Sequence, residues 1–363
     1  MIKTIFEVLN TKKLTISVAE SITGGALSKK LISLAGSSSF FKGSVVTYSD
    51  ESKIEILKIV GGLIALIFGG DLILRSAVAA SNKFKISKIV IGMTVVSFAT
   101  SLPELIVSIR SALEGYPDLA LGNVVGSNIA NLGLVLGFVL LFTRIEVSKS
   151  FYQSDWPMMF IASILLWVFI QNGSITAVEG FALVILLVLM LVYLLRLKDK
   201  SDFIATDDLN TLISWPKIVL LIVFGSIFLT FGSELLVNGS VEVASQLGVS
   251  ERIIAITVVS VGTSIPELAA SLVAISKKEN AISIGNLLGS NLFNILAVIG
   301  ITSLIHPLTV ADNTLLSFDI YVMIGIAALL IPLVFLPKRM EMYWRDGLVL
   351  LAVYVLFIAT TIN

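Results

Sequence analysis

The 363-residue chain contains no cysteine and a single histidine, His306. Without cysteine it has no disulfide, no thiolate metal site and no cysteine nucleophile, and one histidine excludes a zinc site built from several imidazoles. Charged residues are also scarce, at 14% of the chain against roughly 25% in a soluble protein. The 25 basic and 25 acidic residues cancel, so the chain lacks the basic excess that a nucleic-acid partner requires.

Hydrophobic residues make up 56% of the chain, and this composition predicts an all-α polytopic membrane protein. Apolar stretches of about 20 residues, the length a helix needs to cross a bilayer core of about 30 Å, recur from Leu57 onward. Ten spans are expected, at 57–80, 86–113, 119–142, 155–171, 177–196, 216–240, 251–276, 282–304, 315–336 and 347–362.

Lysine and arginine cluster in alternate breaks between these spans. Counted together with the span ends that flank them, the breaks after the odd-numbered spans hold fourteen of them, whereas the other breaks hold only Arg110 and Arg252. Cytoplasmic loops carry the basic excess. The odd breaks are therefore predicted to be cytoplasmic, which places both ends of the membrane domain on the periplasmic side of an inner membrane.

The chain repeats itself at an offset of 163 residues. TVVSFATSLPEL at 94–105 aligns without a gap with TVVSVGTSIPEL at 257–268. At the same offset, GNVVGSNIAN at 122–131 falls on GNLLGSNLFN at 285–294. Five spans separate each element from its copy, and this odd number inserts the two copies in opposite directions. Two inverted five-helix repeats are predicted, at 57–200 and 216–363, with a cytoplasmic linker at 201–215.

Each copy of the first motif places a glutamate in mid-membrane, Glu104 in the second span and Glu267 in the seventh. A charge there costs at least about 2.5–3.5 kcal/mol on insertion scales, so it is expected to face the protein interior and to have a partner or a function. The preceding prolines leave the carbonyl four residues earlier without its helical N–H. Helix breaks are predicted at Pro103 and Pro266, with freed carbonyls at Ala99 and Gly262.

Hydroxyl and amide side chains accompany the glutamates. With the carboxylates and freed carbonyls they form a set of hard oxygen ligands, which suit Na⁺ and Ca²⁺. The first motif supplies the hydroxyls of Ser97, Thr100, Ser101, Ser260, Thr263 and Ser264, and the second supplies Ser127, Asn131, Ser290 and Asn294. The same offset relates two weaker candidates, Asp71 and Glu234, for which a supporting role is predicted; Asp71 has a local partner in Arg75.

These paired motifs resemble the alpha repeats of the calcium/cation antiporter superfamily, in particular bacterial calcium/sodium antiporters, over about residues 57–363. The resemblance implies an exchanger without a cofactor, in which Glu104 and Glu267 form the Ca²⁺ site together with Thr100 and Thr263. It also implies Na⁺ sites at Ser97, Ser101, Ser127, Asn131, Ser260, Ser264, Ser290 and Asn294. In the family the position of Asn294 can be an aspartate, so this cavity has one fewer negative charge.

The expected function is transport, with Ca²⁺ exchanged for Na⁺ across the lipid bilayer by alternating access, and not an enzymatic reaction. Exchange of Ca²⁺ for H⁺ on the same fold is the nearest alternative, because buried glutamates can carry protons. A passive cation channel, which conducts without counter-ion coupling, is a further hypothesis.

The first 58 residues hold eight lysines and no apolar run long enough to span. Residues 19–53, AESITGGALSKKLISLAGSSSFFKGSVVTYSDESK, resemble the opening third of the CinA C-terminal domain, the nicotinamide-nucleotide amidase. The resemblance implies active-site positions at Ser21, Tyr48 and Lys53. A domain that lacks most of its length lacks its core, so a truncated, non-functional α/β-type fragment is predicted at 1–56. Amidase activity is the enzyme hypothesis that rests on it.

Overall fold

The computed structural model describes residues 16–20, 26–33, 41–46, 50–197, 213–247, 260–310, 314–336 and 340–362. Among these, eight helices are long and apolar enough to cross a membrane, and a bent pair, Lys88–Thr100 with Leu102–Leu113, makes a ninth. The structure describes the predicted seventh span, 251–276, only from residue 260 onward. Within this part a shorter apolar helix covers Ile265–Ser276. The protein is a multi-pass, mostly helical membrane protein.

Helices of two kinds follow one another in the chain, ordinary α-helices and wider π-helical turns, labelled η. The elements up to residue 197 are α3 (Asp50–Phe84), α4 (Lys88–Ile91), η2 (Gly92–Val96), α5 (Ser97–Thr100), α6 (Leu102–Leu113), α7 (Pro117–Ala130), η3 (Asn131–Leu136), α8 (Gly137–Leu140), η4 (Phe151–Asp155), α9 (Trp156–Ile170), α10 (Ala177–Val192) and η5 (Tyr193–Leu197). Those after it are α11 (Trp215–Gln246), α13 (Ser260–Gly262), α14 (Ile265–Ser276), α15 (Asn280–Phe293), η8 (Asn294–Ile299), α16 (Gly300–Ile305), η9 (Leu315–Asp319), α17 (Ile320–Phe335) and α18 (Trp344–Ile362).

Two continuous helical rods form the centre of the bundle, α7–η3–α8 and α15–η8–α16. In their most apolar windows 78% and 83% of residues are buried, against 22–33% in the other long helices. Both rods carry the GNxxGSN motif, whose small residues can allow close helix packing. In the second rod a Cβ at Gly285 or Gly289 would collide with the backbone of Ile89 or Met93, whereas nothing lies within 4 Å of a Cβ at Gly122 or Gly126 in the first. The broken helices pack against these rods, so the two repeated motifs lie next to each other in the core.

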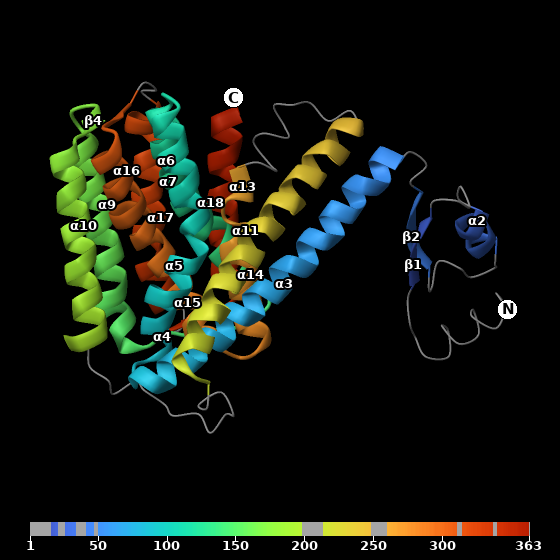
Figure 1. The fold of residues 1–363 in the computed structure, drawn as a ribbon, viewed down its shortest axis with the longest axis horizontal. Helices are drawn as coiled ribbons and strands as arrows, with labels where there is room; N and C mark the ends of the chain where they lie inside the picture. The colour runs from blue at the N-terminus through green and yellow to red at the C-terminus, as the bar shows by residue number, and fades with distance from the viewer. Residues whose placement is uncertain are drawn as a thin grey trace.

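Helices α3 and α11 run side by side and antiparallel across one face of the bundle (Figure 1). Glycines form the seam between them. A Cβ added to Gly62 would lie 2.7 Å from the carbonyl oxygen of Gly232, and one added to Gly69 would lie 2.9 Å from that of Gly225. The two backbones therefore touch directly, which only glycine permits at these positions.

Short strand pairs join the breaks that charge counting assigns to the same side. β3 (Ile145–Glu146) pairs with β6 (Glu341–Met342), which connects the third and ninth breaks. β4 (Ser174–Ile175) pairs with β5 (Leu308–Thr309), which connects the fourth and eighth. Odd breaks thus meet odd breaks and even meet even, as an alternating path through a membrane requires.

The N-terminal stretch has a small β-α-β unit in its described part. β1 (Ile16–Glu20) pairs in parallel with β2 (Phe41–Val46), and α2 (Ala26–Ile32) lies between them in the chain. Helix α3 begins at Asp50, seven residues before the apolar span at 57. Hydropathy detects only the apolar part of a helix, and the polar first turns extend the same rod. Lys53 lies on α3, whereas Ser21 and Tyr48 lie outside the described residues.

Candidate functional site

Each broken helix is interrupted at a serine. Ser101, between α5 and α6, has φ −86° and ψ 4°, and Ser264, before α14, has φ −90° and ψ 3°. The first break bends the helix by 44°. Pro103 and Pro266 lie within the first two positions of the helices that follow, where a proline removes no helical hydrogen bond. Each serine lies between the predicted freed carbonyl, Ala99 or Gly262, and the proline, which is the second residue of the helix that follows.

Glu104 and Glu267 occupy the first turn of α6 and α14, and both are fully buried. A helix N-terminus carries a partial positive charge that favours a carboxylate. By distance and angle, none of the four carboxylate oxygens accepts a hydrogen bond among the described residues, although the hydroxyls of Thr100, Ser101 and Ser290 lie around the Glu267 carboxylate. The two charges lie close enough to repel each other. Such a pair is costly to bury without a cation or protons.

Other buried oxygens without a partner in the described structure form matched pairs around the same place. They are the hydroxyls of Ser101 and Ser264 and the side-chain amide oxygens of Asn131 and Asn294. Each pair is separated by 163 residues, as the glutamates are. Turn η8, which begins at Asn294, contacts α6, and η3, which begins at Asn131, contacts α14. Oxygens from both halves of the chain therefore converge on one buried region.

The sequence of the membrane domain matches a known protein family. Residues 54–196 and 217–363 match the family described as sodium/calcium exchanger protein. The chain belongs to this family. CaxA of Alkalimonas amylolytica is 35% identical over 302 residues, which cover 81% of this chain and 94% of that one. The sodium/calcium exchanger MaX1 of Methanosarcina acetivorans is 28% identical over 344 residues, covering 84% and 97%.

The exchanger also resembles solved structures of NCX_Mj, a sodium-calcium exchanger. One of them superposes with a TM-score of 0.71 at 27% identity and covers 85% of this chain and 99% of that one. These relatives are ion exchangers and not enzymes, so the chain is a cation antiporter of this family.

Residues 1–66 match a second family, the CinA C-terminal domain. A CinA-like protein of Petrotoga mobilis is 54% identical over 56 residues, but these cover only 14% of that protein. The N-terminal stretch is thus a small part of the proteins it resembles.

In the exchanger the predicted hydroxyl ligands differ in what they contact. The Ser97 hydroxyl donates to the carbonyls of Gly92, at 2.7 Å, and Asn286, at 2.9 Å, so it ties α5 to α15. Thr100 Oγ1 lies 3.2 Å from Ser290 Oγ, and Ser101, Thr100 and Ser290 border the Glu267 carboxylate.

Two more predicted positions are less buried than the glutamates: Thr263 is half-buried and Glu234 is exposed. The side chain of Ser260 lies outside the described residues. The Asp71 carboxylate pairs with Arg75 at 2.7 Å and with Lys277 on the second half at 3.4 Å.

The freed carbonyls differ between the halves. The Gly262 carbonyl accepts a hydrogen bond of 2.8 Å from the Ser233 hydroxyl on α11. The position 163 residues earlier than Ser233 is Gly70, which has no hydroxyl to give to the Ala99 carbonyl.

Asn123 and Asn286, polar residues of the second motif, hold the glutamate-bearing helices, a role that the sequence analysis did not predict. Asn123 Nδ2 donates to the Glu104 backbone carbonyl at 3.4 Å and to Ser108 Oγ at 3.1 Å. Asn286 Nδ2 does the same for the Glu267 carbonyl, at 3.5 Å, and for Ser271 Oγ, at 3.3 Å. All these partners repeat at the offset of 163, and that signal was available in the sequence.

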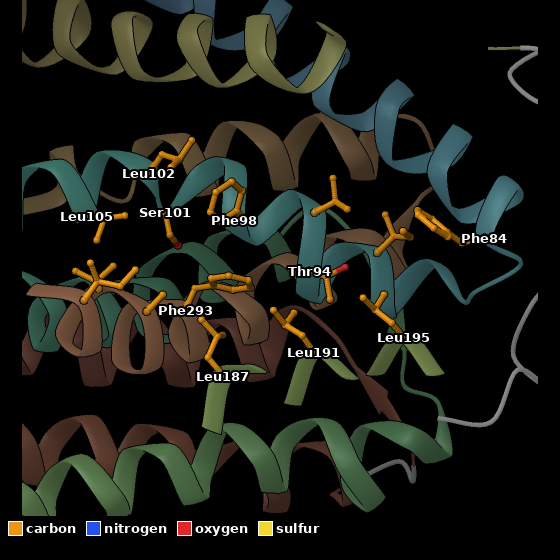
Figure 2. Close-up of a pocket in the computed structure, with 15 residues that line it drawn as sticks. Phe84, Thr94, Phe98, Ser101, Leu102, Leu105, Leu187, Leu191, Leu195 and Phe293 are labelled. Carbon is orange, nitrogen blue, oxygen red and sulfur yellow. The ribbon is translucent and has the colours of Figure 1, made fainter. Parts of the chain in front are cut away.

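A cavity of about 420 Å³ lies beside the first break. Figure 2 shows Ser101 on its wall with Phe98, Leu102 and Leu105. The Thr94 hydroxyl, also on the wall, is bonded to the Val90 carbonyl at 2.7 Å. Because the remaining lining is hydrocarbon, the cavity cannot replace the hydration of a cation. Of the residues in the cluster of oxygens, its wall includes Ser101 alone.

Proposed function

We propose that the exchanger moves Ca²⁺ in exchange for Na⁺ at a site centred on Glu104 and Glu267. The observation that carries this proposal is the pair of fully buried carboxylates without a hydrogen-bond partner in the described structure. Leaving an ion unpaired inside a protein costs several kcal/mol. Two carboxylates balance the charge of one Ca²⁺, and several Na⁺ or protons can take its place.

The remaining ligands are proposed from the same oxygens. Thr100 and Thr263 join the glutamates around Ca²⁺. Na⁺ is held by Ser101, Ser127, Asn131, Ser264, Ser290 and Asn294, with Ser97 and Ser260 at the equivalent positions on the broken helices. The unpartnered oxygens of Ser101, Ser264, Asn131 and Asn294 support this set, because oxygen is the ligand that both ions prefer. A hydroxyl that donates a hydrogen bond keeps its acceptor lone pairs, so Ser97 can bond to α15 and still bind Na⁺.

The proposed architecture is ten membrane helices in two inverted repeats, 57–200 and 216–363, joined by a cytoplasmic linker at 201–215. Hydrogen bonds that recur at the offset of 163 support it, as does the odd-to-odd pairing of breaks. The external ends and the inner-membrane location are part of the proposal; a relative in Escherichia coli, 32% identical over 257 residues, is named inner membrane protein YrbG.

Competition for shared oxygens supplies the coupling in this mechanism. Ca²⁺ and Na⁺ use the same two carboxylates, so binding of one excludes the other. Inverted halves allow outward-facing and inward-facing states of related shape, which expose one central site alternately.

The test is ⁴⁵Ca²⁺ uptake into proteoliposomes with Na⁺ and pH gradients imposed independently. We expect uptake to follow the Na⁺ gradient and to be lost in Glu104→Gln and Glu267→Gln. Glu114→Gln, at an exposed glutamate paired with Arg110, is the matched control and retains uptake. Wild-type flux in both buried variants would contradict the site, and uptake driven by a pH gradient without Na⁺ would instead establish Ca²⁺/H⁺ exchange.

A further inference from the structure

Two buried asparagines that were not assigned as ligands face each other across the halves of the chain. Asn128 lies on α7 and Asn291 on α15, and both are at most 2% exposed. Asn128 Nδ2 donates to the Asn291 backbone carbonyl at 3.3 Å, and Asn291 Nδ2 donates to the Asn128 carbonyl at 3.2 Å. A carbonyl only accepts hydrogen bonds. Each side-chain amide is therefore fixed with its nitrogen toward the opposite backbone and its oxygen pointing elsewhere.

The oxygens fixed in this way determine the orientation of the next pair of amides. Asn128 Oδ1 accepts from Asn294 Nδ2 at 3.1 Å, and Asn291 Oδ1 accepts from Asn131 Nδ2 at 3.1 Å. Asn294 Nδ2 also donates to Ser127 Oγ at 3.0 Å. Because these acceptors require nitrogen, the oxygens of Asn131 and Asn294 lie on the far side of each amide, where both are without a partner in the described structure.

The opposite orientation is unfavourable at both ends of the amide. A flipped Asn294 would set its oxygen against Asn128 Oδ1, so that two acceptors would face each other. It would also turn an NH₂ group, which carries positive hydrogens, toward the region that is to hold cations. The backbone carbonyls of Asn128 and Asn291 thus fix the orientation of the Asn291 and Asn128 amides. These amides in turn fix which atom of Asn131 and Asn294 faces the ion.

We infer that Asn128 and Asn291 are positioning residues that orient Asn294 and Asn131, so that both amide oxygens face the transported cation. The inference rests on the proposed ion site, and it explains why amide oxygens rather than amide NH₂ groups face that site. Each positioning residue acts across the repeats: Asn128 in the first half orients Asn294 in the second, and Asn291 orients Asn131. A carboxylate at 131 or 294 has two equivalent oxygens and needs no such orientation.

The experiment measures equilibrium ⁴⁵Ca²⁺ binding to the full chain in detergent. Asn128→Leu removes both the donor and the acceptor at similar volume. Loss of residues that orient metal ligands typically weakens binding by about 10- to 100-fold, and we expect this range for Asn128→Leu and Asn291→Leu. Asn128→Ala and Asn291→Ala are second variants with the same expected pattern, and elution as a single species with an unchanged melting midpoint identifies variants that fold.

Double variants separate orientation from packing. In the Asn294→Asp background, Asn128→Leu is expected to change the Ca²⁺ affinity by less than about twofold, because the carboxylate needs no orienting partner. In the Asn131→Asp background, the full loss is expected to persist. For Asn291→Leu the expectation is reversed: the Asn131→Asp background removes the loss of affinity, and the Asn294→Asp background retains it. Equal losses in both backgrounds, or equal relief in both, would overturn the inference.

The failure of this inference differs from the failure of the proposed function. If Glu104→Gln and Glu267→Gln still bind Ca²⁺ as the wild type does, the site itself is misplaced. If both lose binding while the two aspartate backgrounds do not discriminate, only the orienting role of Asn128 and Asn291 is wrong.

Discussion

At the residue scale, the Gly262 carbonyl shows how two repeated halves differ in detail. The following proline gives it no helical donor, and the Ser233 hydroxyl on α11 takes that place. The first half has Gly70 at the equivalent position. A buried carbonyl without a donor loses about 1–3 kcal/mol relative to a bonded one. Ser233 therefore stabilises the second broken helix in a way that the first half lacks.

Ser233→Ala is expected to lower the melting midpoint of the exchanger, because it removes the donor to the buried Gly262 carbonyl. The expected loss is about 1–3 kcal/mol, measured by thermal unfolding in detergent. Ser226→Ala is the matched control on the same helix, because the Ser226 hydroxyl bonds to the Ile222 carbonyl of its own helix at 2.9 Å. Equal melting midpoints of the two variants would show that the bond to Gly262 stabilises the exchanger no more than a bond within α11 does.

At the element scale, the seam between α3 and α11 depends on which glycines face it. Gly61 and Gly62 are neighbours on α3, but their surroundings differ. A Cβ at Gly62 would lie 2.7 Å from the Gly232 carbonyl oxygen, whereas nothing lies within 4 Å of a Cβ at Gly61. The two positions have the same helix and the same sequence context, so a substitution series there isolates the effect of helix contact.

Gly62→Leu is expected to destabilise the exchanger and to reduce ⁴⁵Ca²⁺ transport, because the side chain forces α3 away from α11. Overpacking of this kind costs about 1–3 kcal/mol. Gly61→Leu is the control and is expected to retain both stability and transport. Melting curves and initial uptake rates measure the two effects, and equal behaviour of the variants would refute close packing at the seam.

At the scale of the whole molecule, three ion pairs join the two halves at the same end. Asp71 pairs with Lys277, Lys88 with Glu279 at 2.7 Å, and Arg144 with Glu341. Their basic members, Lys88, Arg144 and Lys277, come from breaks that charge counting assigns to the cytoplasm. At the opposite end, Arg110 pairs locally with Glu114. Three of the positive charges that predict the orientation in the membrane thus also join the two halves of the chain.

Lys88→Glu is expected to slow transport, because it places two negative charges side by side at a partly buried contact. Combining it with Glu279→Lys restores the pair and is expected to recover the uptake rate, with a coupling of about 1 kcal/mol in a double-mutant cycle of melting midpoints. Reversing Glu114 by Glu114→Lys is the exposed control, with an expected change of less than about twofold in rate. Additive effects of Lys88→Glu and Glu279→Lys would show that the pair does not couple the halves.

Much of the fold follows from the order of residues. Hydropathy locates nine of the described spans because a bilayer core demands apolar side chains over a set length, and the repeat at 163 identifies Glu104 and Glu267 as a pair. The interruptions at Ser101 and Ser264 lie within the segments between freed carbonyl and proline that the sequence indicates, and each proline lies in the first turn of the next helix, where it is tolerated. The role of the glutamates as the ion site stays a prediction that the proposed transport test addresses.

Composition, periodicity and the internal repeat are local or one-dimensional properties, and they suffice for membrane class and family. Contacts between different helices are of another kind. Whether Asn128 orients Asn294, whether Ser233 reaches Gly262, and which of Gly61 and Gly62 faces α11 depend on how helices rotate and pack against one another. Only the folded chain decides these, because a hydrogen bond forms or fails over a few tenths of an ångström, a distance that no sequence spacing specifies.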